Sequence, residues 1–166
     1  MSIAPAILTA LNTTQDQLVK KMIDDVRTIY SSMLGIELMH LPLEVDPVSQ
    51  FQDCVSAMVG LGGTYSGLVS VHVPTGLAKT FAGAMLGMDV EEVDQDVYDA
   101  LGEIANMVAG NFKQHISKGG GDVRISTPSV ISGKDYIVQC KQNDSINLLF
   151  DVAEEWFMVS TVLSAD

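Results

Sequence analysis

A long helix is predicted for residues 96–117, where apolar and polar positions recur with the period of an α-helix. Positions three and four apart share one face of such a helix. One face is apolar and consists of Val97, Leu101, Ile104, Val108 and Phe112. The opposite face carries Asp99, Glu103 and Asn106, which are spaced by four and three residues. The pattern therefore predicts a helix that packs on one side and presents a polar stripe on the other.

Two further helices are predicted, over residues 14–34 and 75–86. The apolar residues of the first have helical spacing and are Leu18, Met22, Val26, Ile29 and Met33. Thr13 or Thr14 is its candidate N-cap, because a hydroxyl there can accept from the unpaired amides of the first turn. A glycine follows the end of each helix, at positions 35 and 87, as is typical of helix ends.

The remaining segments have strand patterns. Strands are predicted at 54–60, 65–73, 123–131, 136–141, 145–153 and 157–163, with a short strand or an extended connection within 36–47. Two glycines between the first two strands favour a hairpin. Val69, Val71 and Val73 alternate with Ser70 and His72, which predicts a strand buried on one face. The fold class is therefore α+β, a largely antiparallel sheet packed with two long helices and a shorter one.

The composition is that of a single globular domain over residues 1–166. Hydrophobic residues make up 47% of the chain and charged residues 18%, which is enough apolar material for a sizeable core. Residues 1–13 form either a loosely attached arm or a short helix that begins near Pro5. No segment approaches the roughly 20 apolar residues that a membrane span needs.

The net charge narrows the classes of partner. Nine Lys and Arg against 21 Asp and Glu give a formal charge of −12, which repels nucleic acids and anionic membranes. A partner that presents lysines around its own site would be attracted, and salt would weaken that attraction. We therefore expect neither a nucleic-acid nor a membrane partner.

The cysteines and histidines do not indicate a metal site. Cys54 and Cys140 have neither zinc-ligand nor disulfide-framework spacing, and we interpret both as buried small hydrophobes in a reducing cytoplasm. His40 and His72 have no metal-ligand spacing to a carboxylate or cysteine, and His115 falls on the apolar side of its helix. The N-terminus lacks the basic region of a signal peptide, so a cytoplasmic location is expected.

The polar stripe at 99–106 is the strongest candidate for chemistry. Taken by itself, an Asp/Glu/Asn stripe on a helix is most often a solvated face. However, Gly102 and Gly110 flank this stripe, although each glycine costs the helix about 1 kcal/mol relative to alanine. Their presence indicates that something approaches the helix closely. Near the C-terminus, Trp156 and Phe157 are expected to pack in the fold or, alternatively, at a dimer interface.

The stripe also resembles a known motif. Asp99, Glu103 and Asn106, followed after 21 residues by Pro128, are similar to the signature of the CheC/CheX/FliY family of chemotaxis phosphatases. The residues around the stripe resemble the CheX form of this helix, and the element order over most of the chain agrees with a CheC-like or CheX-like fold. CheC-type members have two copies of the Glu/Asn pair, on two related helices. The predicted helix at 14–34 has no such pair, so this chain has one site, which is typical of the CheX type.

The resemblance implies a phosphatase that acts on the aspartyl phosphate of a CheY-like response regulator. Glu103 and Asn106 are then the catalytic residues: Asn106 orients the attacking water, and Glu103 pairs with a lysine of the partner. Asp99, Gly102 and Gly110 would serve docking, and Pro128 would shape the strand beneath or beside the helix. The resemblance implies no cofactor in this chain, with Mg²⁺ on the regulator, and a homodimer joined through sheet edges.

Two other hypotheses remain open. A non-catalytic module could bind a response regulator or act as a scaffold in the same pathway, since CheC-like proteins associate with the deamidase CheD. A structural part of the flagellar switch is a third possibility, although this chain shows no additional switch-type domain. Only the phosphatase hypothesis predicts faster loss of phosphate from the regulator at substoichiometric protein.

Overall fold

The computed structural model describes residues 2–43, 49–118, 122–140 and 144–165. The helices are α1 (Pro5–Ala10), α2 (Gln15–Ile29), a π-helical turn η1 (Tyr30–Leu34), α3 (Thr75–Leu86) and α4 (Gln95–Ile116). The strands are β1 (Met39–Leu41), β2 (Gln50–Gly63), β3 (Tyr65–Pro74), β4 (Val123–Ile125), β5 (Ser129–Ile137), β6 (Ser145–Val152) and β7 (Glu155–Ala165).

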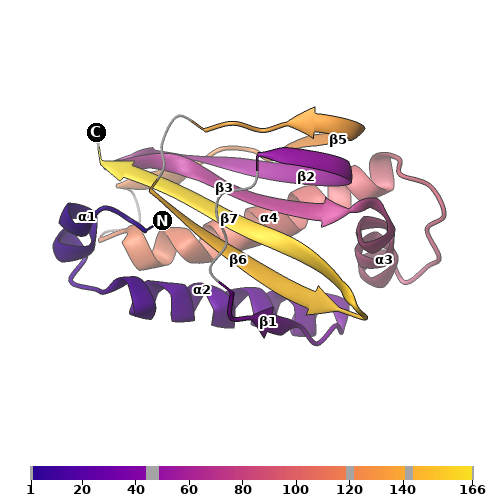
Figure 1. Cartoon of the computed structure of the whole chain (residues 1–166), viewed down its shortest axis with the longest axis horizontal. Helices are drawn as coiled ribbons and strands as arrows, with labels where there is room; N and C mark the ends of the chain where they lie inside the picture. The colour runs from indigo at the N-terminus through magenta and orange to yellow at the C-terminus, as the bar shows by residue number, and fades with distance from the viewer. Residues whose placement is uncertain (1, 44–48, 119–121, 141–143, 166) are drawn as a thin grey trace.

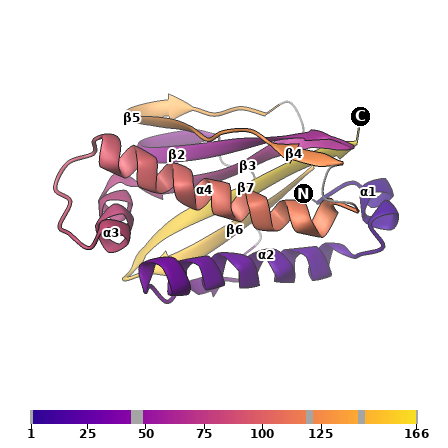
Figure 2. The same cartoon turned by 180° about the vertical axis from the view of Figure 1, so that it is seen from behind.

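The strands form one antiparallel sheet of seven strands in the order β1-β6-β7-β3-β2-β4, and β5 also pairs with β2. The long helices α2 and α4 cover one face of this sheet, and α3 lies at one end (Figures 1 and 2). The other face carries no helix in the described part of the chain (Figure 1). The predicted α+β class is therefore confirmed, with two long helices and a shorter one.

Local sequence signals fix the helix ends. Thr14 and Gln17 form a capping box, in which the Thr14 hydroxyl accepts from the Gln17 amide at 3.2 Å and the Gln17 side chain accepts from the Thr14 amide at 3.2 Å. Gly35 and Gly87 both have φ of 68°, the left-handed conformation that ends a helix at little cost to glycine. The predicted helix at 75–86 is confirmed, whereas the last turn of the one at 14–34 is the π-helical η1.

The hairpin of β2 and β3 is confirmed, but one detail of its burial differs from the prediction. Val69, Val71 and Val73 are fully buried, as expected. Ser70 and His72 on the opposite face are only 4% and 5% exposed, so β3 is buried on both faces. The reason is that aromatic and apolar side chains of neighbouring strands cover that face, which β3 alone cannot indicate.

The strand predicted at 123–131 is interrupted in the structure. β4 ends at Ile125 and β5 begins at Ser129, with Pro128 in the gap. Proline lacks the amide hydrogen that strand pairing requires. The chain therefore pairs with β2 before Pro128, as β4, and again after it, as β5. The strand predicted at 136–141 is also wrong, because β5 continues to Ile137 as one strand, and residue 141 lies outside the described part.

The N-terminal segment is a short helix and not a loose arm. Ile3 is fully buried and Ile7 is 3% exposed, both within the main hydrophobic core. The extended connection expected within 36–47 contains β1, which pairs with β6, while residues 44–47 lie outside the described part. Burial of such side chains stabilises a fold by about 1.5–3 kcal/mol each, so α1 is held firmly.

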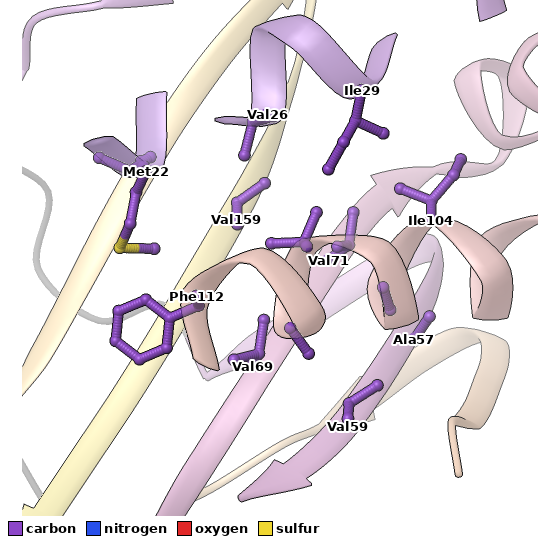
Figure 3. Close-up of a cluster of buried hydrophobic side chains, with 14 of the residues drawn as sticks. Met22, Val26, Ile29, Ala57, Val59, Val69, Val71, Ile104, Phe112 and Val159 are labelled. Carbon is purple, nitrogen blue, oxygen red and sulfur yellow. The ribbon is translucent and has the colours of Figure 1, made fainter. Parts of the chain in front are cut away.

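The main core lies between the helices and the sheet. Figure 3 shows side chains of α2, α4, β2, β3 and β7 meeting there: Met22, Val26, Ile29, Ala57, Val59, Val69, Val71, Ile104, Phe112 and Val159. At the rim of this layer, His115 of α4 pairs with the Asp25 carboxylate of α2 at 2.5 Å. The two long helices are thus joined by apolar packing and by this hydrogen bond.

Trp156 and Cys140 are both exposed, which leaves for Trp156 the alternative prediction of a dimer interface. Trp156 is 52% exposed and does not pack in the core, whereas its neighbour Phe157 is fully buried. Adjacent residues of a strand point to opposite faces, so only one of this pair can enter the core. Cys140 is exposed and Cys54 half-buried, and both are free thiols, so Cys140 is not the buried residue we expected. None of the described helices is long and apolar enough to cross a membrane.

Candidate functional site

The candidate site lies on α4, which is anchored over its whole length. Its apolar face is buried and consists of Val97, Leu101, Ile104, Val108 and Phe112, none more than 3% exposed. Asp94 is the N-cap of the helix, and its carboxylate accepts from the Asp96 amide at 3.1 Å. The acidic residues before the helix thus include its N-cap, as helix electrostatics favours. A helix held in this way presents its outer side chains in fixed positions.

The predicted polar stripe is present on the outer face of α4. Asp99 and Glu103 are exposed, and Asn106 is half-buried. Their spacing of four and three residues places them along one side of the helix, away from the core. The structure therefore brings together the three polar residues that the sequence places on one face.

A groove borders this stripe, with a volume of about 520 Å³. It lies between α4 and the chain around Pro128, and its lining residues are Gln95, Tyr98, Asp99, Gly102, Glu103, Pro128 and Val130. No lysine or arginine is among these lining residues. The groove is therefore electrostatically suited to a cationic group of another molecule.

Pro128 enters the groove by packing against Gly102. A Cβ atom added to Gly102 would lie 3.4 Å from Pro128 Cγ and 3.8 Å from Val130 Cγ2. Gly102 is accordingly buried, and part of what approaches the helix here is the chain itself. Pro128 thus lies against the helix, and its role in shaping the neighbouring strand stays a prediction. A role of Gly102 in docking stays a prediction.

Gly110 differs from Gly102. No atom lies within 4 Å of the position that a Cβ would occupy there, so this part of the helix surface is open among the described residues. Asn111 beside it is half-buried. The approach of a partner to Gly110 is sterically possible and stays a prediction.

Two contacts that the sequence did not suggest hold the groove in shape. The Gln95 side-chain amide donates to the Asp99 carboxylate at 2.7 Å. The hydroxyls of Tyr98 on α4 and Ser132 on β5 share a hydrogen bond of 3.0 Å. The first pair has helical spacing and could have been found from the sequence. The second joins residues 34 apart, and only the folded chain reveals it.

Glu103 and Asn106 are available to another molecule. Within the described part of the chain, neither side chain has a hydrogen-bond or ion-pair partner. Both groups are strong hydrogen-bonding groups, and Glu103 is accessible to solvent. A carboxylate and an amide one turn apart on a fixed helix can bind a cation and orient a small polar molecule.

The histidines lie away from this stripe. His115 pairs with Asp25, as described above, and His40 lies against the Phe150 ring. Burial and, secondarily, the Arg27 charge lower the pKa of His40, and burial lowers the pKa of His72 to about 4. In the part of the chain that the structure describes, no three His, Cys, Asp or Glu side chains are grouped so that they could hold a metal ion.

Comparisons with known proteins point to one family. A family model described as chemotaxis phosphatase CheX matches residues 55–151, which include α4 and Pro128. The CheY-P phosphatase CheX of Thermotoga maritima is 28% identical over 120 residues, covering 72% of this chain and 77% of that protein. A crystal structure of a chemotaxis protein CheX from Desulfovibrio desulfuricans has a TM-score of 0.76 at 29% identity, covering 89% of this chain and 99% of that chain.

A third similar protein shares the fold at lower identity. The CheX-CheY-BeF3-Mg²⁺ complex from Borrelia burgdorferi contains a chain that matches with a TM-score of 0.67 at 18% identity. The match covers 87% of this chain and 95% of that chain. The expected CheC-like or CheX-like fold is thereby confirmed, as is the resemblance inferred from the motif.

Proposed function

The chain belongs to the CheX family of chemotaxis phosphatases, and on this premise we propose that it hydrolyses the aspartyl phosphate of a CheY-type response regulator. The relative from Thermotoga maritima is named a CheY-P phosphatase, and a CheX of the same fold forms a complex with CheY. In this chain, one observation carries the proposal: Glu103 and Asn106 lie on the outer face of an anchored helix and have no hydrogen-bond or ion-pair partner among the described residues.

Asn106 is proposed to position the nucleophile. Phosphoryl transfer to water requires an in-line water molecule and neutralisation of charge, with little covalent work for the protein. The amide oxygen of Asn106 accepts a hydrogen from this water, and its NH₂ group donates to a phosphoryl oxygen. The water oxygen bonds to phosphorus as the bond to the aspartyl oxygen breaks, and the products are inorganic phosphate and a free carboxylate. Asn106 itself is chemically unchanged.

Glu103 is proposed to bind a lysine of the regulator and thereby orient it. The negative groove around Glu103 favours such a cation, and a carboxylate at the position of Asn106 would repel the phosphate. Asp99, held by Gln95, would contribute to docking at the rim. Gly102 and Gly110 would allow close approach, and Pro128 would support the helix from the side. The catalytic pair thus acts as a rigid insert into the partner's site.

The proposed reaction uses no cofactor held by this chain. The Mg²⁺ that neutralises the phosphoryl group would be supplied by the regulator, whose own site binds it. We expect removal of Mg²⁺ by a chelator to abolish turnover while leaving the melting temperature of this protein unchanged. A fall in its melting temperature on chelation would contradict this assignment.

We also propose a homodimer joined through the edge strand β5. This strand pairs with β2 on one side, and no described strand pairs with its other side. Ile131 and Ile137 on it are 40% and 68% exposed. Exposed strand edges with apolar side chains favour pairing with another chain. Light scattering should give twice the monomer mass, and Ile137→Lys should shift it toward the monomer. A monomeric native protein would contradict this proposal.

The first experiment follows the decay of a phosphorylated CheY-type regulator in Mg²⁺, with and without this protein at substoichiometric concentration. We expect accelerated decay that is lost in Asn106→Ala while binding persists. Binding without acceleration by the native protein, with every CheY-type regulator of the same genome, would reject catalysis. It would leave the non-catalytic binding or scaffold module as the function.

A further inference from the structure

A second concave site lies on the sheet face opposite α4. Its volume is about 530 Å³. The lining residues come from β2, the end of β3, the β6–β7 turn and β7, and they are Gln50, Phe51, Gln52, Cys54, His72, Pro74, Glu154, Glu155, Trp156 and Met158. On β3 and β7, His72 and Met158 of this lining alternate with Val71, Val73 and Val159, which are buried beneath the helices. The stripe on α4 and this pocket therefore lie on opposite sides of the sheet.

The floor of the pocket is a fixed aromatic surface. The rings of Phe51 and His72 stack with centroids 4.1 Å apart and planes 11° apart. Hydrogen bonds hold both ring nitrogens of His72, with Ser56 Oγ at 2.6 Å and Ser70 Oγ at 3.0 Å. Tyr136 OH is 2.7 Å from the same Ser56 hydroxyl. These contacts leave the histidine ring no freedom to rotate, so the floor is preformed.

The wall of the pocket is acidic and includes an exposed indole. The chain turns between β6 and β7 at Ala153 and Glu154, whose φ angles are 49° and 71°. This turn places Glu154, Glu155 and Trp156 in succession at the end of the sheet, all exposed. Trp156 is 52% exposed, so its indole ring is accessible to another molecule at this wall.

The charges around the pocket have one sign. No lysine or arginine is among its lining residues, and Glu154 and Glu155 each bring a carboxylate. Burial lowers the pKa of His72 to about 4, so this ring is neutral near pH 7. The pocket therefore combines one accessible aromatic ring, that of Trp156, above the buried Phe51–His72 pair, with two acidic residues and no lysine or arginine among its lining residues.

We propose that this pocket binds an arginine side chain presented by a basic segment of a partner protein. A guanidinium group is planar, weakly hydrated and permanently charged, so it stacks on aromatic rings and forms paired hydrogen bonds with carboxylates. The pocket offers both kinds of contact at one place. Lysine suits it less well, because its ammonium group is strongly hydrated and cannot stack.

The inference is tested by titrating the protein with the peptide acetyl-Gly-Arg-Gly-Arg-Gly-amide. Trp156 is the single tryptophan of the chain, so its fluorescence reports on this pocket alone. Calorimetry measures the affinity in parallel. The matched peptide has citrulline in place of arginine, which keeps the shape and removes the charge. We expect saturable binding of the arginine peptide, about tenfold weaker binding of the citrulline peptide, and weakening by added salt.

A charge-matched pair of variants locates the binding. The double variant Glu154→Gln/Glu155→Gln should bind the arginine peptide about tenfold more weakly than the native protein. The control is the double variant Glu91→Gln/Glu92→Gln, which changes an exposed pair in the loop before α4 and should bind the peptide with native affinity. Both variants should retain the native phosphatase rate, because none of these residues touches the α4 stripe. Equal affinity of the two variants, or of the two peptides, would overturn the proposal.

Acrylamide quenching tests whether a second copy of the chain fills the pocket instead. An open pocket predicts efficient quenching of Trp156 in the free protein at every protein concentration, and protection when the arginine peptide is added. Protection in the free protein that increases with protein concentration would mean that another copy occupies the pocket, and it would overturn the proposal.

Discussion

The stripe on α4 and the pocket on the opposite face of the sheet use polar side chains in different ways. On α4, Glu103 and Asn106 lie on an anchored helix without partners in the described part of the chain. Behind the pocket, the polar groups of Ser56, His72 and Tyr136 bond to one another. The first arrangement leaves hydrogen-bonding capacity for another molecule, and the second uses it to fix a shape.

This difference predicts separate consequences of mutation. A polar residue near the surface whose side chain makes no hydrogen bond within its own chain can be changed with little loss of stability. Replacement of a buried polar residue that is hydrogen-bonded costs more stability, because its hydrogen-bond partners are then left buried and unpaired. Variants on α4 should therefore affect activity and not folding, and variants beneath the pocket should affect folding and not activity.

The largest expected effect is that of Asn106→Ala. Loss of one positioning group that acts in the transition state lowers kcat by about 100- to 1000-fold, and the free energy of unfolding should change by less than about 0.5 kcal/mol. The assay is the decay of the phosphorylated regulator, with denaturant unfolding alongside. Asn111→Ala on the same helix is the matched control and should retain the native rate. Equal activity of the two variants would remove Asn106 from the mechanism.

Glu103→Gln should weaken docking more than it changes chemistry. Removal of one member of an interfacial charge pair costs about 2–3 kcal/mol, which corresponds to about 30- to 150-fold in affinity. Calorimetry with a regulator carrying Mg²⁺ and BeF3⁻ measures this loss. Binding of the native protein should weaken with salt, and binding of the variant should depend less on salt. A variant with native affinity and a lower kcat would assign Glu103 to the chemical step instead.

His72 should make folding sensitive to acid. Its pKa is about 4 in the native protein, against about 6.5 in an unfolded chain. Between these values the unfolded state binds a proton that the native state does not, so stability falls as the pH drops through this window. From pH 7 to about pH 4.5, the free energy of unfolding should decrease by about 2 kcal/mol more in the native protein than in His72→Gln.

Urea unfolding at the two pH values measures this difference. His40→Gln is the control, because the pKa of His40 is also lowered but its ring is less deeply buried. We expect its pH dependence to stay close to that of the native protein. If His72→Gln had the same pH dependence as the native protein, the neutral state of His72 would have no part in stability.

The smallest effects are those of alanine at the two glycines of α4. Gly110→Ala enters open space and should stabilise the protein by up to about 1 kcal/mol through helix propensity. Gly102→Ala brings a Cβ to 3.4 Å from Pro128 Cγ, so its gain should be smaller. Thermal unfolding measures both. A fall in regulator binding in either variant, at unchanged stability, would support a docking role for that glycine, and native binding would contradict it.

Much of the helical part of the structure could be predicted from the sequence. The period of α4 placed Asp99, Glu103 and Asn106 on one face, and the structure has them there. Thr14, one of the two candidate N-caps, begins α2, and the left-handed Gly87 ends α3 as expected. The resemblance to the CheX signature linked these residues to Pro128. Each of these signals lies within a few turns of one helix or within one motif, so it can be recognised without knowledge of the fold.

The sheet could be predicted only in outline. The hairpin was correct, but the continuous strand across Pro128 was wrong, because its pairing with β2 depends on an amide that proline lacks. The same limit applies to Ser132, which meets Tyr98 only because β5 pairs with β2 beside α4. Which side chains line the groove is thus a property of strand pairing.

The sequence by itself determined the polar stripe, the helix ends and the family, because a helix satisfies its hydrogen bonds and sets its faces among neighbouring residues. Tertiary structure alone decided that His72 is buried, that Gly102 lies beneath Pro128, and that Trp156 faces solvent beside an acidic turn. The physical reason is that a strand has two equivalent faces. Which of them is covered depends on residues far away in the chain.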